Sequence, residues 1–175
     1  TPESGDGLNF YLAQARLRAL FDDQPEQAVA WFRDRLEEGL PPAQLSAAEY
    51  GLAVALERQR EFGEARRLID GLLARDPDKL PYLLQLASLE LETGEGDASR
   101  ERLADLHHGF PGNHAIAVQY AEALLRPREP ALATTAAGVL KAQLRERTDS
   151  PYLYKLYARA SAIAGNDITA AEALA

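Results

Sequence analysis

The spacing between two prolines constrains the fold of this chain more than any other feature of its sequence. Pro77 and Pro111 are 34 residues apart, and each follows a helical pattern and precedes a new amphipathic segment. A spacing of about 34 residues is the period of the tetratricopeptide repeat, a helix-turn-helix unit. Such a unit cannot cover its own apolar face, so the spacing predicts helix pairs that stack on one another.

The apolar pattern inside one period fits the same unit. In the unit from Ser46 to Lys79, Ala53 and Ala65 occupy the positions of closest helix approach, and Gln59–Glu61 forms the turn. We therefore predict an all-α fold, a right-handed α-solenoid of tetratricopeptide repeats. Residues 1–175 form a single domain in this prediction, with repeats near 9–45, 46–79, 80–113 and 114–150, and an incomplete one near 151–175.

Helix start signals refine the expected boundaries. Ser46 with Glu49 fits a capping box, and Asp149 or Ser150 before Pro151 fits an N-cap followed by proline at the first helical position. No segment shows the alternation of a strand. The helices are expected at about 8–21, 25–38, 44–59, 62–74, 80–93, 96–109, 113–126, 130–146, 150–164 and 167–175.

The charge balance and the composition exclude several classes of function. Nineteen Lys and Arg stand against 27 Asp and Glu, a net charge of −8, which argues against nucleic acid and anionic membranes as partners and favours basic ones. The absence of cysteine excludes disulfides and thiol chemistry. No apolar run reaches the roughly 20 residues that span a bilayer. Since the chain lacks an initiator Met and ends in an Ala-rich segment, we expect it to be cut from a longer protein.

No motif in the chain predicts catalysis or a bound cofactor. The histidines His107, His108 and His114 do not have the H-E-x-x-H spacing of a zinc-binding helix. The acidic pairs Asp22–Asp23 and Glu37–Glu38 fall at expected helix ends, where solvated carboxylates are ordinary. No G-x-S-x-G nucleophile motif occurs. We predict that these 175 residues hold no catalytic residue, no metal site and no cofactor site.

The repeat register instead predicts a protein-binding face. In such arrays the first helix of each pair lines the concave surface. The residues on that face are mainly apolar and aromatic, and Tyr, Phe and Arg commonly anchor interfaces. The predicted protein-binding residues are Phe10, Phe21, Tyr50, Val54, Glu57, Leu84, Ser88, Leu91, Val118, Glu122, Leu125, Tyr152, Lys155 and Arg159. The alternative is that several of them, particularly Leu84, belong together with Leu17 to the core between repeats.

Five segments also carry a resemblance to a known family. They are Ala15–Asp23, Pro25–Arg33, Tyr50–Leu56, Glu64–Arg67 and Tyr154–Ala160. They resemble the C-terminal tetratricopeptide region of bacterial periplasmic zinc metalloproteases of the β-barrel assembly-enhancing protease type. The resemblance implies a periplasmic location in a Gram-negative bacterium, and a zinc-dependent catalytic domain outside this segment. No zinc ligand or catalytic Glu carries over to a residue of this chain.

These expectations combine into one functional hypothesis and one alternative. We expect an interaction module that binds the outer-membrane β-barrel assembly machinery, unfolded outer-membrane clients, or its own protease domain, with chaperone-like consequences. Direct membrane insertion and nucleic-acid binding are not expected. The alternative is a self-associating tetratricopeptide scaffold or adaptor unrelated to proteolysis, in which an apolar face of one copy pairs with another copy.

Overall fold

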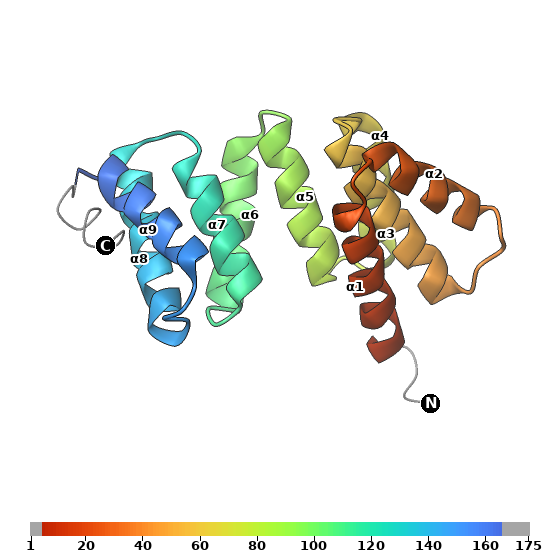
Figure 1. Cartoon of the computed structure of the whole chain (residues 1–175), viewed down its shortest axis with the longest axis horizontal. Coiled ribbons are helices and arrows are strands. Elements are labelled where there is room, and N and C mark those ends of the chain that lie inside the picture. The colour runs from red at the N-terminus through yellow and green to blue at the C-terminus, as the bar shows by residue number, and fades with distance from the viewer. Residues whose placement is uncertain (1–4, 166–175) are drawn as a thin grey trace. The chain divides into compact units, whose positions relative to one another are not determined.

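Residues 5–165 are described by a computed structural model, in which helices connected by short turns account for the regular structure (Figure 1). Within this range no residue lies in a strand. The helices of the described range are α1 (Gly5–Phe21), α2 (Pro25–Leu36), α3 (Pro42–Arg58), α4 (Phe62–Arg75), α5 (Leu80–Glu92), α6 (Gly96–Gly109), α7 (His114–Leu125), α8 (Pro130–Glu146) and α9 (Pro151–Ile163). The prediction of an all-α fold is confirmed.

Prolines and caps explain why the helices begin where they do. Five of the helices, α2, α3, α5, α8 and α9, have proline in their first turn, where its fixed φ suits the helix and its missing N–H costs nothing. The Ser150 side chain accepts a hydrogen bond from the Leu153 backbone N–H at 3.4 Å, as predicted. The capping box at Ser46 is wrong, because α3 already begins at Pro42 and Ser46 lies inside it.

The chain forms two compact units, one ending at Thr93 and the other beginning at Gly94. In the first unit α3 is the central helix and packs against α1, α2 and α4, while α5 packs on α4. The apolar core joins side chains from all five helices, with Leu12, Phe32, Ile69 and Leu89 among those that are almost fully buried. This sharing of one core by successive helix pairs is the packing expected of stacked repeats.

One glycine determines how closely two helices of the first unit approach. The ring of Phe32 from α2 packs directly against Gly51 of α3, and ring atoms fill the space that a Cβ atom at position 51 would occupy.

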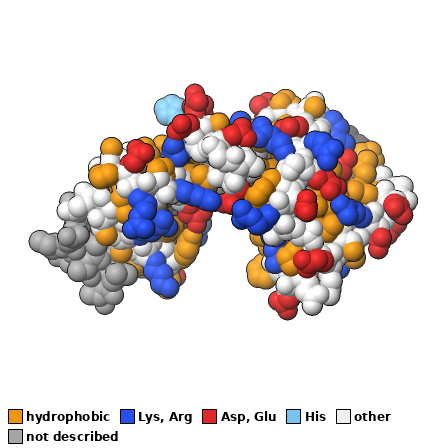
Figure 2. All heavy atoms as spheres, turned by 90° about the horizontal axis from the view of Figure 1, so that it is seen from above, with side chains coloured by type: hydrophobic (Ala, Val, Ile, Leu, Met, Phe, Trp, Pro, Cys, Tyr) orange, Lys and Arg blue, Asp and Glu red, His pale blue; other side chains and the backbone are white. Residues whose placement is uncertain are grey.

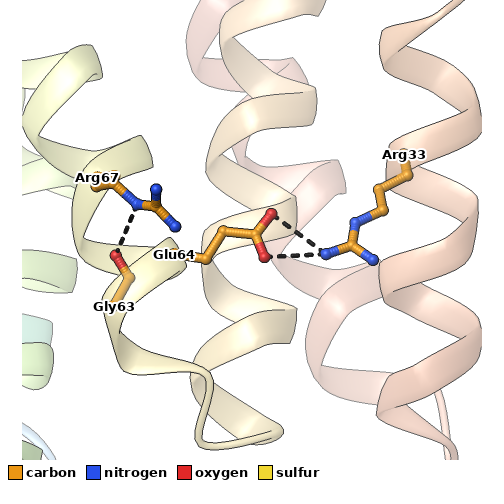
Figure 3. A network of polar contacts seen from close by, with 4 residues as sticks. All are labelled: Arg33, Gly63, Glu64 and Arg67. Atoms are coloured by element: carbon orange, nitrogen blue, oxygen red, sulfur yellow. Dashed lines mark hydrogen bonds and ion pairs between the residues drawn. The ribbon is translucent and has the colours of Figure 1, made fainter.

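An ion pair joins α2 and α4 on the outer side of the same unit. Figure 3 shows Arg33 of α2 donating to both carboxylate oxygens of Glu64 in α4, at 3.2 and 2.9 Å. Arg67 of α4 is not part of this pair, and its Nε donates to the Gly63 carbonyl (Figure 3).

In the second unit α8 packs between α7 and α9, and α6 packs on α7. Its own apolar cluster includes Leu124, Leu140, Leu153 and Leu156. The N-cap of α7 is Asn113, whose side chain accepts a hydrogen bond from the Ile116 backbone N–H at 3.1 Å. The unit therefore has a core of its own, formed by helices that are close in sequence.

The helix pairs α1–α2, α3–α4 and α7–α8 lie near the ranges predicted for the repeats at 9–45, 46–79 and 114–150, and the division of the chain into these repeats stays a prediction. The repeat predicted near 80–113 would join α5 and α6, which belong to different units, so its pairing and the single-domain assignment stay predictions. Helix α9 is the first helix of the repeat predicted near 151–175. The helix predicted over 167–175 lies outside the described residues.

Candidate protein-binding surface

The candidate surface of the first unit is the side formed by α1, α3 and α5, the first helices of their predicted pairs. We call it the A-face and define it by the residues Arg16, Val54, Glu57, Gln85 and Ser88. Helix α3 contacts α1 along much of its length and touches α5 more lightly. Polar side chains from all three helices therefore meet over an otherwise apolar core.

Arg16 joins the three helices of the A-face. Its Nη1 donates to the Tyr50 hydroxyl at 3.1 Å and to Gln85 Oε1 at 3.3 Å. The Tyr50 ring lies against the ring of Tyr82, with centroids 5.8 Å apart. Burial raises the pKa of the Tyr50 hydroxyl, and the nearby Arg16 guanidinium partly offsets this effect. Tyr50 consequently acts as a neutral, buried acceptor that orients Arg16.

Glu57 is the acidic member of the A-face. Its carboxylate accepts a hydrogen bond from Ser88 Oγ at 2.5 Å and another from Gln85 Nε2. Burial raises the pKa of Glu57, the Ser88 hydrogen bond opposes the rise, and the charge of Glu92 adds to it. A half-buried carboxylate held by two neutral donors keeps acceptor capacity for a further donor on a ligand.

Two hollows open on either side of Arg16. One, of about 320 Å³, lies beside Glu57, and the other, of about 520 Å³, lies beside Tyr50. Their walls are formed by Arg16, Leu20, Val54, Glu57, Arg58, Arg60, Phe62, Gln85, Ser88 and Glu92 in the first hollow, and by Asn9, Leu12, Ala13, Arg16, Tyr50, Lys79, Leu80 and Pro81 in the second. The second hollow combines apolar walls with a few polar groups, whereas most residues of the first hollow are polar or charged, and both mixtures suit contacts with the side chains of a polypeptide.

Charges on the first unit are mixed in sign. In the view of Figure 2, basic and acidic side chains alternate over this unit and do not separate into fields of one sign. Within the first hollow the same mixture holds, with Arg16, Arg58 and Arg60 against Glu57 and Glu92. A partner would therefore be selected by local pairing on this unit, and much less by a long-range field.

The second unit has a smaller polar cluster on α7 and α9. The Tyr152 hydroxyl donates to Glu122 Oε1, and partial burial together with that carboxylate raises the pKa of Tyr152 to about 12. Lys155 and Arg159 are exposed on the same helix as Tyr152. In this unit the predicted binding residues Tyr152, Lys155 and Arg159 are therefore all exposed side chains of one helix.

The structure corrects the expected exposure of three predicted binding residues. Tyr50, Val54 and Leu125 are only 2%, 3% and 0% exposed, because each points into the core of its own unit. Tyr50 and Val54 each leave only a small exposed area in the wall of a hollow on the A-face. All three residues belong to the apolar clusters, as the core alternative expects, whereas Leu17, which that alternative also places in the core, is exposed.

The other predicted residues remain at least partly accessible. Exposed side chains are those of Phe10, Phe21, Tyr152, Lys155 and Arg159. Half-buried side chains are those of Glu57, Leu84, Ser88, Leu91, Val118 and Glu122. The structure brings Glu57 and Ser88 together on the A-face, and Glu122 and Tyr152 together in the second unit. Their role in binding stays a prediction.

The repeat register did not identify Arg16, Gln85 and Arg58 as residues of the candidate surface. Gln85 is 4% exposed, and its polarity on an apolar helix face was the available signal. Arg58 Nη1 donates to the backbone carbonyls of Ala19 and Asp22 at 2.5 and 3.0 Å, so it caps the end of α1 from α3. These roles depend on which helices are neighbours, and a one-dimensional pattern does not contain that information.

The histidines occupy separate environments in the second unit. The His107 ring lies 5.7 Å from the Tyr120 ring, His108 is exposed, and His114 Nδ1 is 3.0 Å from Gln143 Oε1. Over residues 5–165 no three His, Cys, Asp or Glu side chains gather in a way that could hold a metal ion. The helices of that range are also too short or too polar to cross a membrane.

Comparison with known proteins bears on the resemblance seen in the sequence. No family model matches the chain. The β-barrel assembly-enhancing protease of Escherichia coli (strain K12) is 26% identical over 158 residues, which are 90% of this chain and 31% of that protein. The same protein of Yersinia pestis is 26% identical over 125 residues, 71% of this chain and 26% of that protein. The chain thus spans less than a third of the length of the relatives it matches.

Solved structures confirm the fold. MamA of AMB-1 has a TM-score of 0.62 at 16% identity, covering 96% of this chain and 95% of that chain. MamA of MSR-1 has a TM-score of 0.64 at 15% identity, covering 95% of this chain and 92% of that chain. MamA is a tetratricopeptide-repeat protein. The chain therefore has the α-solenoid fold of tetratricopeptide repeats and resembles part of the β-barrel assembly-enhancing proteases, and both findings fit a protein-interaction module.

Proposed function

We propose that this chain is the interaction module of a periplasmic zinc metalloprotease and that the A-face of its first unit holds a segment of another polypeptide. The partner belongs to one of three classes: the outer-membrane β-barrel assembly machinery, an unfolded outer-membrane protein, or the protease domain of the same protein. The observation that carries the proposal is the pair of hollows on either side of Arg16, lined by three successive first helices.

The A-face suits an extended segment for two physical reasons. Its hollows are already formed, so little ordering of the module opposes binding. Arg16 and Glu57 offer one donor and one acceptor in the wall of the first hollow, and these groups can pair with the backbone or side chains of a bound chain. Binding of this kind needs no metal or cofactor from this chain.

The parent protein and its location come from the resemblance. The relatives are named for enhancing β-barrel assembly and for proteolysis, and only part of each aligns with this chain. Within the proposal, catalysis belongs to the part of the parent protein outside this similarity, and the module brings a substrate or an assembly partner to it. A Gram-negative periplasm is the compartment in which such a partner would be met.

The test uses an unfolded outer-membrane β-barrel protein, labelled with a fluorophore, diluted from urea and titrated with the chain while anisotropy is recorded. Leu20 is 41% exposed and lines the hollow beside Glu57, so Leu20→Glu places a charge there without disturbing the core. We expect binding to weaken at least about tenfold, the loss of an interface contact worth roughly 1.4 kcal/mol.

The matched control is Ala74→Glu, at an exposed position of α4 that lines neither hollow. It should bind as the unchanged chain does, and both variants should keep their helical circular dichroism. Equal affinity for Leu20→Glu and the unchanged chain would place binding elsewhere. A complete lack of binding by the unchanged chain would remove unfolded barrel proteins as its partners.

A further inference from the structure

A separate pocket of about 430 Å³ opens in the first unit between α1, α2 and the beginning of α3. We call it the α1–α2 pocket. It shares no lining residue with the two hollows of the A-face. It exists because α1 packs mainly on α3 and only lightly on α2, which leaves the two helices of the first pair apart.

The floor of the α1–α2 pocket is apolar and made of small groups. Ala15, Ala47 and Ala48 are buried there and line the pocket together with Phe32. A floor of alanines leaves depth for a side chain from outside, and the volume is enough for one large aromatic or aliphatic side chain with its neighbours. The pocket can thus take a bulky apolar anchor.

The rim of the pocket carries two arginines around one tryptophan. The guanidinium of Arg18 lies over the Trp31 ring at 3.9 Å from its centroid, and that of Arg35 lies 5.7 Å from the same centroid. Contact with the ring face positions the Arg18 guanidinium and leaves its N–H groups able to donate, whereas Arg35 already donates to Glu38 and Gln44.

Among the described residues, none that lines the pocket is acidic, although the whole chain has a net charge of −8. Arg18 also lines a neighbouring hollow together with Asp22 and Asp23. Arg35 is partly neutralised by Glu38 at 2.5 Å. Arg18 forms no ion pair with any residue in the part of the chain that the structure describes. Arg18 is therefore the cation best placed to receive a carboxylate from another molecule.

Exposed apolar side chains continue from the rim along α1. Leu17 is 56% exposed and Phe21 78% exposed, and Trp31 of the rim is itself 37% exposed. Leu17 and Phe21 are four residues apart and so lie on the same face of the helix. A bound segment with one apolar anchor in the pocket could make a second apolar contact with Leu17 and Phe21.

We propose that the α1–α2 pocket binds an acidic amphipathic segment of a partner protein, with a bulky apolar side chain between the alanines and Trp31 and an adjacent carboxylate on Arg18. Charge complementarity favours this occupant, because a carboxylate gains two-pronged hydrogen bonds from a guanidinium whereas a basic segment would be repelled by both arginines. The pocket thus selects the charge opposite to the one favoured by the net charge of the chain.

Trp31 is the only tryptophan of the chain, so its fluorescence reports directly on the pocket. The probes are three short peptides without Trp that carry the same Leu and Phe anchors flanked by Glu, by Gln or by Lys. We expect the Glu peptide to change Trp31 emission saturably and to bind at least tenfold more tightly than the Gln peptide. The Lys peptide should bind most weakly of the three.

Arg18→Glu should reverse this order and favour the Lys peptide, which a general loss of structure could not do. The matched control is Arg67→Glu on α4, an exposed arginine outside the pocket, which should keep the original order. Leu20→Glu on the A-face should also keep it, and Arg18→Glu should keep the affinity for an unfolded barrel protein. The proposals for the α1–α2 pocket and for the A-face can therefore be disproved independently.

Three results would overturn the proposal. The first is equal affinity for the Glu and Gln peptides. The second is peptide binding by calorimetry with no change in Trp31 emission. The third is an emission change that depends on the concentration of the chain alone, with a dimer in sedimentation, because the pocket would then receive a second copy of this chain.

Discussion

At the scale of single residues, the half-buried charge of Glu57 lowers the free energy of unfolding at neutral pH. Its carboxylate is half-buried between Gln85 and Ser88, and burial raises its pKa above the usual value for glutamate. A raised pKa means that the folded chain holds the proton more tightly than the unfolded chain does. The tighter binding of this proton therefore adds to the free energy of unfolding. The addition is complete below the ordinary pKa of glutamate and is lost as the pH rises through the raised pKa of Glu57.

Replacing Glu57 by Gln should therefore raise the free energy of unfolding at neutral pH. The amide keeps an acceptor for Ser88 and removes the half-buried charge. At about pH 3, which is well below the ordinary glutamate pKa of about 4.3, the side chain is protonated in both states and the gain should shrink. Urea titrations followed by circular dichroism at the two pH values measure both effects.

The control for this prediction is Glu26→Gln, at an exposed position of α2, which should change stability little at either pH. If Glu57→Gln lowers the free energy of unfolding at neutral pH, the carboxylate stabilises the A-face more than its burial costs. The polar contacts of Glu57 would then outweigh desolvation.

At the scale of the helices, the contact between α2 and α3 depends on one position without a side chain. A Cβ atom at Gly51 would overlap with the ring of Phe32, which is only 1% exposed, so the ring would have to shift from its packed position toward the α1–α2 pocket that it lines. The close approach of these two helices requires glycine at this position.

We expect Gly51→Ala to destabilise the first unit by about 1–2 kcal/mol, because the overpacking cost of roughly 1–3 kcal/mol exceeds the helix-propensity gain of up to about 1 kcal/mol. Thermal and urea unfolding measure the change. Gly71→Ala in α4 is the matched control, since nothing lies within 4 Å of the added Cβ there. It should stabilise the chain by about 0.5–1 kcal/mol. Equal effects at the two glycines would contradict the proposed packing.

The sequence predicted the helices well because their signals are local. Pro25, Pro130 and Pro151 each stand in the first turn of a helix, and Ser150 caps the last of these. Two local signals for a helix start compete before α3. Ser46 resembles an N-cap, but Pro42 starts the helix earlier, so the prediction of a cap at Ser46 is wrong. Helix boundaries follow from such signals, although their ranking depends on the loop before the helix.

At the scale of the whole molecule, the two units have separate apolar clusters. Leu140 of α8 is fully buried within the cluster of the second unit, and Ile69 is fully buried within that of the first. In repeat arrays stability is close to a sum of local terms with coupling between neighbours. A defect in one cluster should then be felt mainly in its own unit.

Leu140→Ala should destabilise the second unit by about 2–5 kcal/mol, the usual cost of such a cavity. Native-state hydrogen exchange should show lower protection of the amides in α7, α8 and α9, while those in α3 keep their protection. The reciprocal variant, Ile69→Ala, should reverse the pattern. A uniform loss of protection in either variant would show that the chain unfolds as one cooperative unit.

The sequence by itself determined the helices, their pairing signals and the repeat fold, because the 34-residue spacing and the apolar pattern are encoded along the chain. Only the tertiary structure decided which side chains of the first helices reach the surface. Tyr50 and Val54 share the register of accessible residues but are buried, since α3 has neighbours on several sides. The α1–α2 pocket likewise depends on the packing of α1 against α3, and the spacing of residues along the chain does not encode that choice of neighbour.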